Sequence, residues 1–288
     1  MDFPNYFADA ESTFNQARFI LFSVPFEKTS SFRHGADKGP FEIRQASWNF
    51  ERYDLRTGVS FDDTAVHDGG DLDVNASTSK QVFEKTQEYT SSILRHQKIP
   101  VALGGDHSIT PGIVSAFPKD TAVLSLDAHL DFRTQYKNDA FNHACVIRRI
   151  ADFIDIENIA VLGIRSIEKE ELDQAKKLGL FFYDAFTIRS QGLPEVIEKT
   201  KNYLKGKKMY LTIDIDVIDP AYAPGTSTPE PFGLTPQDIL DIIDSFSSLL
   251  IGFDVVEVCP PYDHGQTALL AAKLTRTCIS KIWSSQKK

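Results

Sequence analysis

The sequence predicts an α/β fold in which a mainly parallel sheet is covered by helices on both faces. Short apolar runs alternate with amphipathic stretches along almost the whole chain, as they do in proteins built from strand–helix units. The runs are rich in Val, Ile and Leu and lack a polar residue at every second position. That pattern is typical of parallel strands that are buried on both sides.

The positions of the elements follow from these two patterns. We expect strands at residues 19–24, 100–103, 122–126, 159–162, 180–183, 209–213 and 250–258. We expect helices at residues 80–95, 168–178, 194–204 and 235–247. The last begins with Thr235 and Pro236, a cap residue followed by proline at the first helical position, which favours a helix start.

Length and composition indicate an ordinary globular protein. The chain has 288 residues, of which 42% are hydrophobic and 25% charged, and no repeat, low-complexity tract or linker divides it. We therefore expect a single domain spanning residues 1–288. The formal net charge of −9 argues against nucleic acid or an anionic membrane as the partner and is compatible with a small cationic substrate.

Cysteine usage and the absence of targeting segments favour a cytoplasmic location. The chain begins without the basic and apolar segments of a signal peptide, and no stretch approaches the roughly 20 apolar residues of a membrane span. Cys145, Cys259 and Cys278 are widely spaced and odd in number. We expect free thiols in a reducing compartment rather than disulfides.

Three polar clusters follow expected strands, at the edge where ligands bind in folds of this kind. They are Gly104-Gly105-Asp106-His107-Ser108, Asp127-Ala128-His129-Leu130-Asp131 and Asp214-Ile215-Asp216. Residues two apart in an extended chain face the same side, so the polar members of each cluster can converge. Together with His107 they would place four carboxylates and two imidazoles at one edge of the sheet.

This set of side chains favours a metal site. Four close carboxylates repel one another and take up protons unless cations balance them, and two divalent ions carry the required charge. Oxygen-rich ligation with some imidazole and no thiolate suits manganese better than zinc or copper. Taken singly, an Asp-x-Asp pair is more often a helix cap or a surface pair, and His129 alone can be a core histidine. The three clusters together favour ligation.

The clusters, in this order, resemble the signature motifs of the ureohydrolase family, which includes arginases and agmatinases. The likeness covers almost the full chain. It extends to Pro25-Phe26, Thr29, Arg33, Gly35, Gly39-Pro40 and Ile43-Arg44, to Asp219-Pro220-Ala221, Ala223-Pro224-Gly225-Thr226 and Thr228-Pro229-Glu230, and to Asp254-Val255-Val256-Glu257-Val258 and Thr267-Ala268.

The resemblance implies a three-layer αβα architecture with a mainly parallel sheet of roughly eight strands, the arginase/deacetylase-type fold. It also implies two Mn²⁺ ions per chain and a homo-oligomer, commonly a trimer or hexamer. By position, His107 and Asp131 would bind one ion and His129 and Asp216 the other. Asp127 and Asp214 would contact both ions.

The chemistry implied is release of urea from a guanidinium compound. A guanidinium is a poor electrophile, and two metal ions that share a water lower its pKa enough to supply hydroxide near neutral pH. The departing amine needs a proton, which we expect Asp131 to pass on. His143 is the candidate proton shuttle and substrate contact. Its setting, Asn142-His143-Ala144-Cys145, differs from the family's usual Ser-His-Gly, and local packing at a helix start is the alternative.

Glu257 is the expected contact for the guanidinium group. It ends an apolar run, where a buried carboxylate is costly unless it is paired, and a guanidinium offers two charge-assisted hydrogen bonds. The family resemblance implies the same role, and a structural salt bridge with an internal arginine is the alternative. We expect Cys145 and Cys259 to be buried small hydrophobes.

The loop after the third cluster resembles agmatinases more than arginases, which favours agmatine as the substrate. Glu230 is a candidate contact for the cationic tail, although a strand-capping or salt-bridge role is equally open. Arg133 would repel agmatine and favour a carboxylate if it faced the tail, but we expect it to pair with an acid such as Asp139. Ser227 and Phe232 replace glycines usual in the family, and Phe232 would narrow or line the tail pocket. Arginine, guanidinobutyrate and N1-aminopropylagmatine remain alternative substrates.

Two other classes of protein remain. A single-zinc, deacetylase-like hydrolase would need fewer carboxylate ligands, and the second Asp-x-Asp pair together with His107 counts against it. A catalytically silent homologue that acts as a binding subunit is the other alternative. The intact set of expected ligands, with Glu257, argues against that role.

Overall fold

The computed structural model describes residues 3–286 and contains an eight-stranded sheet with the order β4-β1-β5-β10-β9-β6-β7-β8. The strands are β1 (Phe19–Val24), β4 (Val66–Asp71), β5 (Ile99–Gly104), β6 (Ala122–Leu126), β7 (Ile159–Ile164), β8 (Phe181–Asp184), β9 (Met209–Asp214) and β10 (Leu250–Val256), with β2 (Tyr53–Asp54) and β3 (Val59–Ser60) forming a separate antiparallel pair. Every pairing within the large sheet is parallel. The predicted parallel α/β sheet is confirmed.

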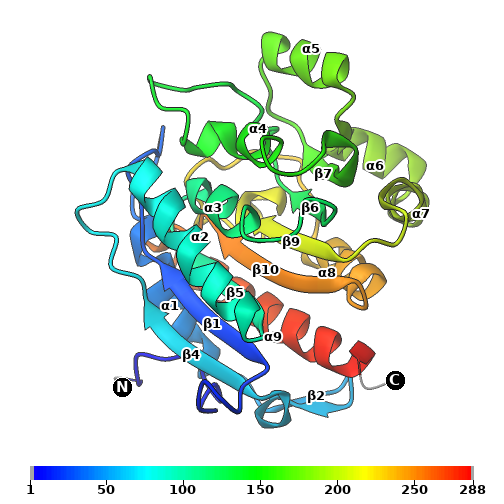
Figure 1. Ribbon diagram of the computed structural model, residues 1–288. Coiled ribbons are helices and arrows are strands. Elements are labelled where there is room, and N and C mark those ends of the chain that lie inside the picture. The colour runs from blue at the N-terminus through cyan, green and yellow to red at the C-terminus, as the bar shows by residue number, and fades with distance from the viewer. Residues whose placement is uncertain (1–2, 287–288) are drawn as a thin grey trace.

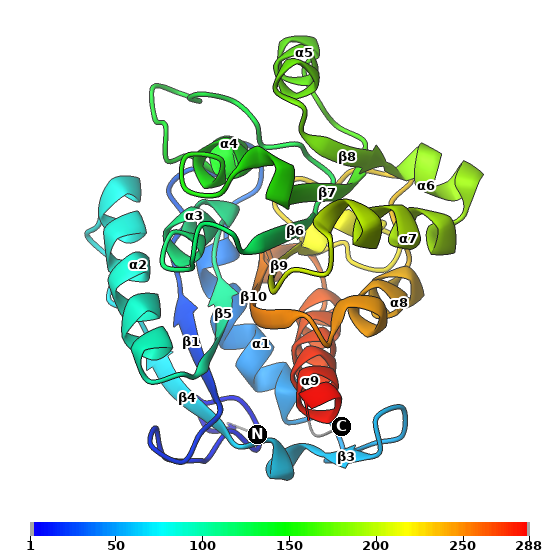
Figure 2. The same cartoon turned by 45° about the vertical axis from the view of Figure 1, so that its right-hand side comes forward.

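Helices cover both faces of this sheet, as Figures 1 and 2 show. The helices are α1 (Gly39–Ser47), α2 (Ser79–Arg95), α3 (Thr110–Val114), α4 (Val146–Ile150), α5 (Lys169–Leu178), α6 (Ala185–Gln191), α7 (Leu193–Leu204), α8 (Pro236–Phe246) and α9 (Gln266–Gln286). Short 3-10 helices η3 (His107–Ile109), η4 (His143–Cys145) and η6 (Ile215–Val217) follow strand ends or loops near the site. Helices α2, α3 and α4 lie on one face and α1, α8 and α9 on the other, which confirms the three-layer architecture.

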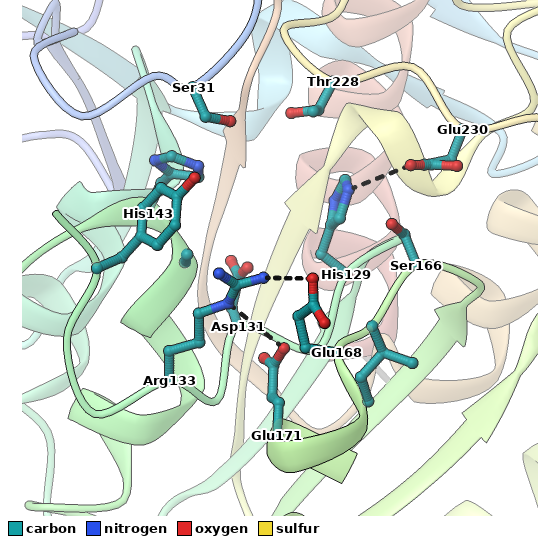
Figure 3. A pocket seen from close by; sticks show the side chains of 13 residues that line it. Ser31, His129, Asp131, Arg133, His143, Ser166, Glu168, Glu171, Thr228 and Glu230 are labelled. Atoms are coloured by element: carbon teal, nitrogen blue, oxygen red, sulfur yellow. Dashed lines mark ion pairs between the residues drawn. The ribbon is translucent and has the colours of Figure 1, made fainter.

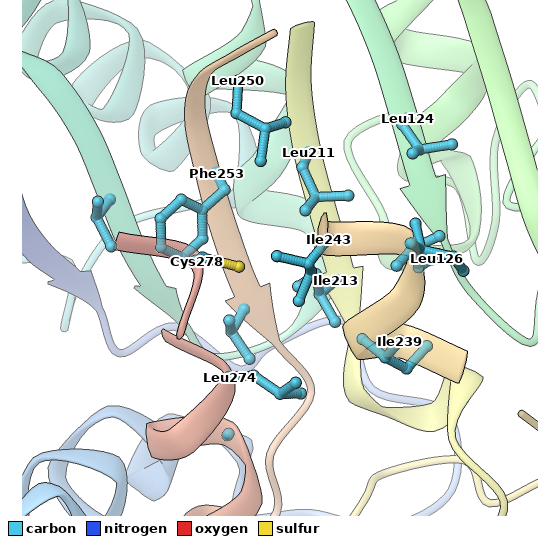
Figure 4. Close-up of a cluster of buried hydrophobic side chains, with 14 of the residues drawn as sticks. Leu124, Leu126, Leu211, Ile213, Ile239, Ile243, Leu250, Phe253, Leu274 and Cys278 are labelled. Atoms are coloured by element: carbon cyan, nitrogen blue, oxygen red, sulfur yellow. The ribbon is translucent and has the colours of Figure 1, made fainter. Parts of the chain in front are cut away.

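Two apolar cores fill the spaces between the layers, because successive side chains of a buried strand point to opposite faces. Leu124 and Leu211 belong to the core under α8 and α9, whereas Val123 and Tyr210 belong to the core under α2, α3 and α4. Figure 4 shows strand leucines and isoleucines packed against α8 and α9. Each fully buried leucine or isoleucine contributes roughly 1.5–3 kcal/mol of transfer free energy.

The expected strands and helices are all present, with small shifts at their ends. Strand β10 stops at Val256 instead of residue 258, because Glu257 takes a left-handed conformation with φ 64°. The sequence did not predict the edge strand β4, whose residues Val-His-Asp-Gly-Gly-Asp form no apolar run. Helix α9 was also not predicted, and it packs against α1. Among the described residues, no helix is long and apolar enough to cross a membrane.

A buried ion pair ties α1 to the edge strand β4. The Arg44 guanidinium donates from Nε and Nη2 to the two carboxylate oxygens of Asp68, each at 2.8 Å, and from Nη1 to Asp71 at 2.6 Å. The side chains of Arg44 and Asp68 are each 1% exposed. Polar groups thus anchor a strand that has little apolar surface of its own to bury.

We expect Arg44→Met to lower the free energy of unfolding by about 3–5 kcal/mol, because it leaves the Asp68 carboxylate buried without its cation. Urea denaturation followed by circular dichroism measures the loss. Arg56→Met is the matched control, since Arg56 lies 2.6 Å from Asp244 but its side chain is 39% exposed. The control should lose less than about 1 kcal/mol. Equal losses in the two variants would contradict the role assigned to burial.

Candidate metal centre and active-site pocket

The three predicted clusters lie at the carboxyl ends of neighbouring strands in the middle of the sheet. Strands β5, β10, β9 and β6 are adjacent in this order. The register pairs Val256 of β10 with Asp214 of β9 and Leu126 of β6 with Ile213 of β9, so the strands end at one level. The residues that follow each strand therefore meet at one edge, although they are far apart in the sequence.

Each cluster is stiffened by a carboxylate that accepts a hydrogen bond from the amide two residues further on. Asp127 Oδ1 accepts from the amide of His129 at 2.6 Å, and Asp214 Oδ1 accepts from the amide of Asp216 at 2.9 Å. One oxygen of each aspartate thus shapes the turn. The other oxygen, Oδ2, faces His107.

Glycine is required where β5 ends. A Cβ atom on Gly105 would lie 2.0 Å from the carbonyl oxygen of Phe26, so only glycine lets the chain pass this close. The next amide, that of Asp106, donates to the same carbonyl at 2.8 Å. This close approach fixes the position of His107.

The structure brings the expected ligands together in two groups. His107 Nδ1 lies 3.1 Å from Asp127 Oδ2 and 3.3 Å from Oδ2 of both Asp131 and Asp214. His129 Nδ1 lies 3.0 Å from Asp216 Oδ2 and 3.6 Å from Asp127 Oδ1. The sets His107–Asp127–Asp214 and Asp127–His129–Asp216 each offer ligand atoms within 4.8 Å of one another. Asp127 is common to both sets, as the resemblance implies.

The hydrogen bonds of His107 show that the site fits a metal. The Thr212 hydroxyl donates to Asp254 Oδ1 at 2.6 Å and lies 2.9 Å from His107 Nε2. Since that hydroxyl has a single proton, Nε2–H of His107 is the donor and Nδ1 carries the lone pair. Among residues 3–286, no group forms a hydrogen bond with the buried atoms His107 Nδ1 and Asp127 Oδ2. A lone pair that faces three carboxylates needs a cation between them.

The pKa shifts point to the same shortage of positive charge. Burial opposes a charge on His107, yet the carboxylates of Asp127, Asp131 and Asp214 outweigh it and raise the pKa of His107 well above its usual range. Burial and the charge of Asp127 raise the pKa of Asp131 to about 7. Divalent ions would supply the positive charge that these shifted groups otherwise take up as protons.

A pocket of about 230 Å³ opens above the cluster (Figure 3). Candidate ligands form part of its wall, and charged side chains of the surrounding loops form the rest. The residues that line it are Ser31, His129, Asp131, Arg133, Tyr136, His143, Ala144, Ser166, Ile167, Glu168, Glu171, Thr228 and Glu230. The candidate substrate contacts His143 and Glu230 are therefore placed at one cavity with the candidate ligands.

His143 begins η4 and lines the pocket, and its hydrogen bonds define its neutral form. The Thr29 hydroxyl donates to Asp106 Oδ2 at 3.0 Å, and it lies 3.0 Å from His143 Nδ1. With the hydroxyl proton used, Nδ1–H of His143 donates to Thr29 and Nε2 keeps the lone pair. Burial lowers the pKa of His143, which favours this form. The role of His143 as a shuttle stays a prediction.

Glu257 is buried and joins two parts of the site. Its Oε1 accepts from the amide of His107 at 2.7 Å, and its Oε2 accepts from the hydroxyl of Ser227. Burial raises its pKa to about 8. Within residues 3–286 no arginine pairs with Glu257, so the alternative of a structural salt bridge does not hold. Its contact with a guanidinium stays a prediction, since Glu257 does not line the pocket.

The predicted partner of Arg133 is wrong. Asp139 accepts instead from the Ser79 hydroxyl at 2.5 Å and from the amide of Phe141 at 2.8 Å. The guanidinium of Arg133 lies 3.6 Å from Glu171 and 4.0 Å from Glu168, at the start of α5. These partners are distant in sequence and were not foreseen.

The predicted position of Phe232 is also wrong. It has φ 69°, its ring lies 6.4 Å from that of Phe186, and it is 67% exposed. It does not line the pocket. Glu230 does reach the pocket, where its carboxylate lies 3.9 Å from His129 Nε2. Cys145 and Cys259 are free and buried as expected, and so is Cys278.

Sequence reasoning missed Arg165, which connects the third cluster to the loop of Glu230. Its guanidinium donates to the backbone carbonyls of Asp216 at 2.6 Å, Val217 at 3.3 Å and Glu230 at 2.6 Å. Arg165 directly follows β7, at the edge of the sheet where ligands bind in folds of this kind, and that position is a signal for its role. The sequence motifs include Thr29 without indicating its hydrogen bonds, and no sequence pattern distinguishes Thr212.

Fold and site together define a three-layer α/β protein with a candidate metal centre, and comparison with known proteins gives its family. Residues 17–280 match the model of the Arginase family. An agmatinase of Bacillus cereus is 35% identical over 95% of this chain and 94% of its own length. An N(1)-aminopropylagmatine ureohydrolase of Thermococcus kodakarensis is 37% identical over 90% of this chain and 88% of its own length. The crystal structure of the agmatine ureohydrolase of Thermoplasma volcanium, 36% identical, superposes with a TM-score of 0.95 and covers 100% of this chain and 97% of that one.

The chain belongs to the arginase family and is a hydrolase that acts on the C–N bond of a guanidino group. This confirms the resemblance found in the sequence motifs. It also decides against the single-zinc deacetylase-like alternative. The ligand groups fit the metal dependence of the family.

We expect Thr212→Val to weaken binding of a divalent ion by about tenfold, because His107 loses the acceptor that fixes its tautomer. Thr212→Ser keeps the hydroxyl and is the matched control, with affinity close to that of the wild type. Competition with a fluorescent chelator measures both dissociation constants. Unchanged affinity in the valine variant would show that the Thr212 hydroxyl does not orient His107.

Proposed function

We propose that this protein is an agmatinase, which hydrolyses agmatine to urea and putrescine with two Mn²⁺ ions per chain. The observation that carries the proposal is the charge of the outer pocket. Apart from the candidate ligands His129 and Asp131, the charged side chains that line it are the carboxylates of Glu168, Glu171 and Glu230 and the guanidinium of Arg133, a formal excess of two negative charges. Agmatine ends in an ammonium that this wall attracts, whereas arginine ends in an α-carboxylate beside its amine. The names of the Bacillus and Thermoplasma relatives support this choice.

In this proposal the two groups of ligands hold the ions and the remaining residues handle substrate and protons. His107 and Asp131 would hold one ion, His129 and Asp216 the other, and Asp127 and Asp214 both. The bound ions would supply a hydroxide nucleophile near neutral pH by lowering the pKa of water. The donor set contains carboxylates and imidazoles without thiolate, which suits Mn²⁺.

Two side chains of the pocket wall, Asp131 and His143, would transfer protons. Asp131 lines the pocket beside the other candidate ligands, where its carboxylate would accept a proton and pass it to the departing amine. Nε2 of His143 then exchanges protons between the pocket and solvent. Glu257 would contact the guanidinium, because each of its oxygens accepts only one hydrogen bond within the protein. Glu230 would contact the tail.

A longer cationic substrate is a second candidate, and a specific feature favours it. A second pocket, of about 330 Å³, adjoins the first and shares Arg133, Glu168 and Glu171 with it, and Glu170 adds another carboxylate. The additional amine of N1-aminopropylagmatine would find negative charge there. The Thermococcus relative carries this activity in its name.

The proposal includes a single catalytic domain in a cytoplasmic homo-oligomer, a trimer or hexamer. The large sheet takes strands from residue 19 to residue 256, which supports one domain. Three free buried thiols support a reducing compartment. Light scattering measures the assembly.

We expect the purified chain to bind two Mn²⁺ ions and to lose urea release after treatment with EDTA, with recovery on addition of Mn²⁺. Asp131→Asn should lower kcat by about a hundredfold or more, as loss of a metal ligand and proton carrier does. Asp152→Asn is the control, because Asp152 pairs with Arg148 and Arg149 outside the pocket. Equal activity of Asp131→Asn and wild type would support a different chemistry.

We expect kcat/KM for agmatine to exceed that for arginine by about a hundredfold or more, a difference of about 2.7 kcal/mol in transition-state binding. Urea release from agmatine, arginine, 4-guanidinobutyrate and N1-aminopropylagmatine, measured side by side, tests this. A preference for aminopropylagmatine would select the second candidate. Absence of urea from every compound, with two ions bound, would contradict both.

A further inference from the structure

We propose that Arg133 determines which substrate tails the pocket accepts. Its guanidinium pairs with the carboxylates that a tail ammonium would bind, so the ammonium must displace Arg133 from them. The inference deepens the proposed function and rests on it. Arg133 lies two residues after Asp131 and lines the same pocket as the candidate ligands Asp131 and His129. Figure 3 shows the ion pairs that join its guanidinium to Glu168 and Glu171.

The contacts between the Arg133 guanidinium and its carboxylate partners are long. Nε lies 3.6 Å from Glu171 Oε2 and Nη2 lies 4.0 Å from Glu168 Oε1. By contrast, the buried Arg44 forms bonds of 2.6 and 2.8 Å. The Arg133 side chain is 33% exposed, and its guanidinium stacks on the ring of Tyr136 at 4.8 Å. Ion pairs of this length and exposure are weak, so that another cation can compete for the same carboxylates.

The carboxylates differ in how firmly they are fixed. Glu171 is buried, with a side chain that is 6% exposed, and its Oε1 accepts from the amide of Phe132 at 2.6 Å. Its Oε2 therefore keeps a fixed direction toward Arg133. Glu168 is 72% exposed, and within residues 3–286 its side chain makes no capping hydrogen bond at the start of α5. Glu171 is the fixed acceptor, and Arg133 is the partner that can move.

Arg133 has open space on its far side. It forms part of the wall between the pocket above the ligands and the adjoining pocket of about 330 Å³. A guanidinium that leaves Glu171 can turn into that space without displacing packed side chains. A cationic tail then takes the freed carboxylate, while an anionic tail meets Arg133 itself. The charge at the end of the substrate tail therefore decides whether the tail binds Glu171 or Arg133, and this sets the preference between substrates.

The test uses three compounds with similar chains and different ends: agmatine, n-butylguanidine and 4-guanidinobutyrate. In Arg133→Gln we expect kcat/KM to rise about fivefold for agmatine and to fall about fivefold for 4-guanidinobutyrate, the size expected for a partly exposed charge at close range. Most of the change should appear in KM, because tail binding precedes the chemistry. Butylguanidine, with a neutral end, should change by an intermediate factor.

Two further variants separate charge from structure. Arg133→Lys keeps the cation and should keep the preference between the two charged tails within about threefold of wild type. Glu168→Gln removes a carboxylate beside Arg133 and should shift the preference the opposite way, toward 4-guanidinobutyrate. Arg148→Gln is the matched control, since it removes a guanidinium that pairs with Asp152 outside the pocket. It should leave the preference unchanged.

The same compounds are titrated by calorimetry, so that tail preference is measured whether or not urea is released. If all three respond to Arg133→Gln by one common factor, Arg133 is a structural residue and the inference is overturned. A gain for 4-guanidinobutyrate in that variant overturns it as well. Failure of the proposed function looks different, because the wild type itself then releases no urea while its tail preference in binding is still measurable.

Discussion

The crowding of negative charge at the ends of β5, β9 and β6 is the constraint on which the rest of the site depends. Five aspartates, Asp106, Asp127, Asp131, Asp214 and Asp216, are buried there together with the neighbouring Glu257. Such groups are stable as anions only when cations or hydrogen bonds compensate them. The carboxylates of Asp127, Asp131 and Asp214 raise the pKa of His107 well above its usual range. The strand register makes this crowding unavoidable, because it ends adjacent strands at one level.

Hydrogen bonds through two threonine hydroxyls orient the histidines at the cluster. The Thr212 hydroxyl connects the buried Asp254 to His107 through two hydrogen bonds. The Thr29 hydroxyl connects Asp106 to His143 in the same way. In both sets of hydrogen bonds a threonine hydroxyl donates to a carboxylate, and this determines which ring nitrogen of the histidine keeps its lone pair. Among residues 3–286, the hydrogen bonds of the Arg165 guanidinium go to backbone carbonyls, and its charge interacts with the nearby carboxylates of Asp216 and Asp127. Arg165 thus adds both rigidity and positive charge to this side of the cluster.

We expect selectivity to arise further out, where solvent weakens electrostatic interactions. Glu168, Glu230 and Arg133 are partly or largely exposed, in contrast to the buried candidate ligands His107, Asp127, Asp131, Asp214 and Asp216. Replacing one charged residue of this outer part should change the affinity for the substrate tail modestly, whereas replacing a candidate metal ligand should abolish hydrolysis. Members of the family can therefore differ in the guanidino compound they cleave while the sheet edge and its clusters stay the same.

The sequence by itself determined the parallel sheet, the three clusters and the family, because apolar runs and residues two apart are local patterns. It did not reveal the edge strand β4, which depends on Arg44 of α1 rather than on apolar residues of its own. From the sequence we expected Arg133 to pair with Asp139, but its partner in the structure is Glu171. We also expected Phe232 to line the pocket, but its exposed ring lies near Phe186. These contacts join segments distant in the chain. Only the packing of α5 and of the loop after η6 decided them, since side-chain partners across such distances are set by tertiary geometry and not by local pattern.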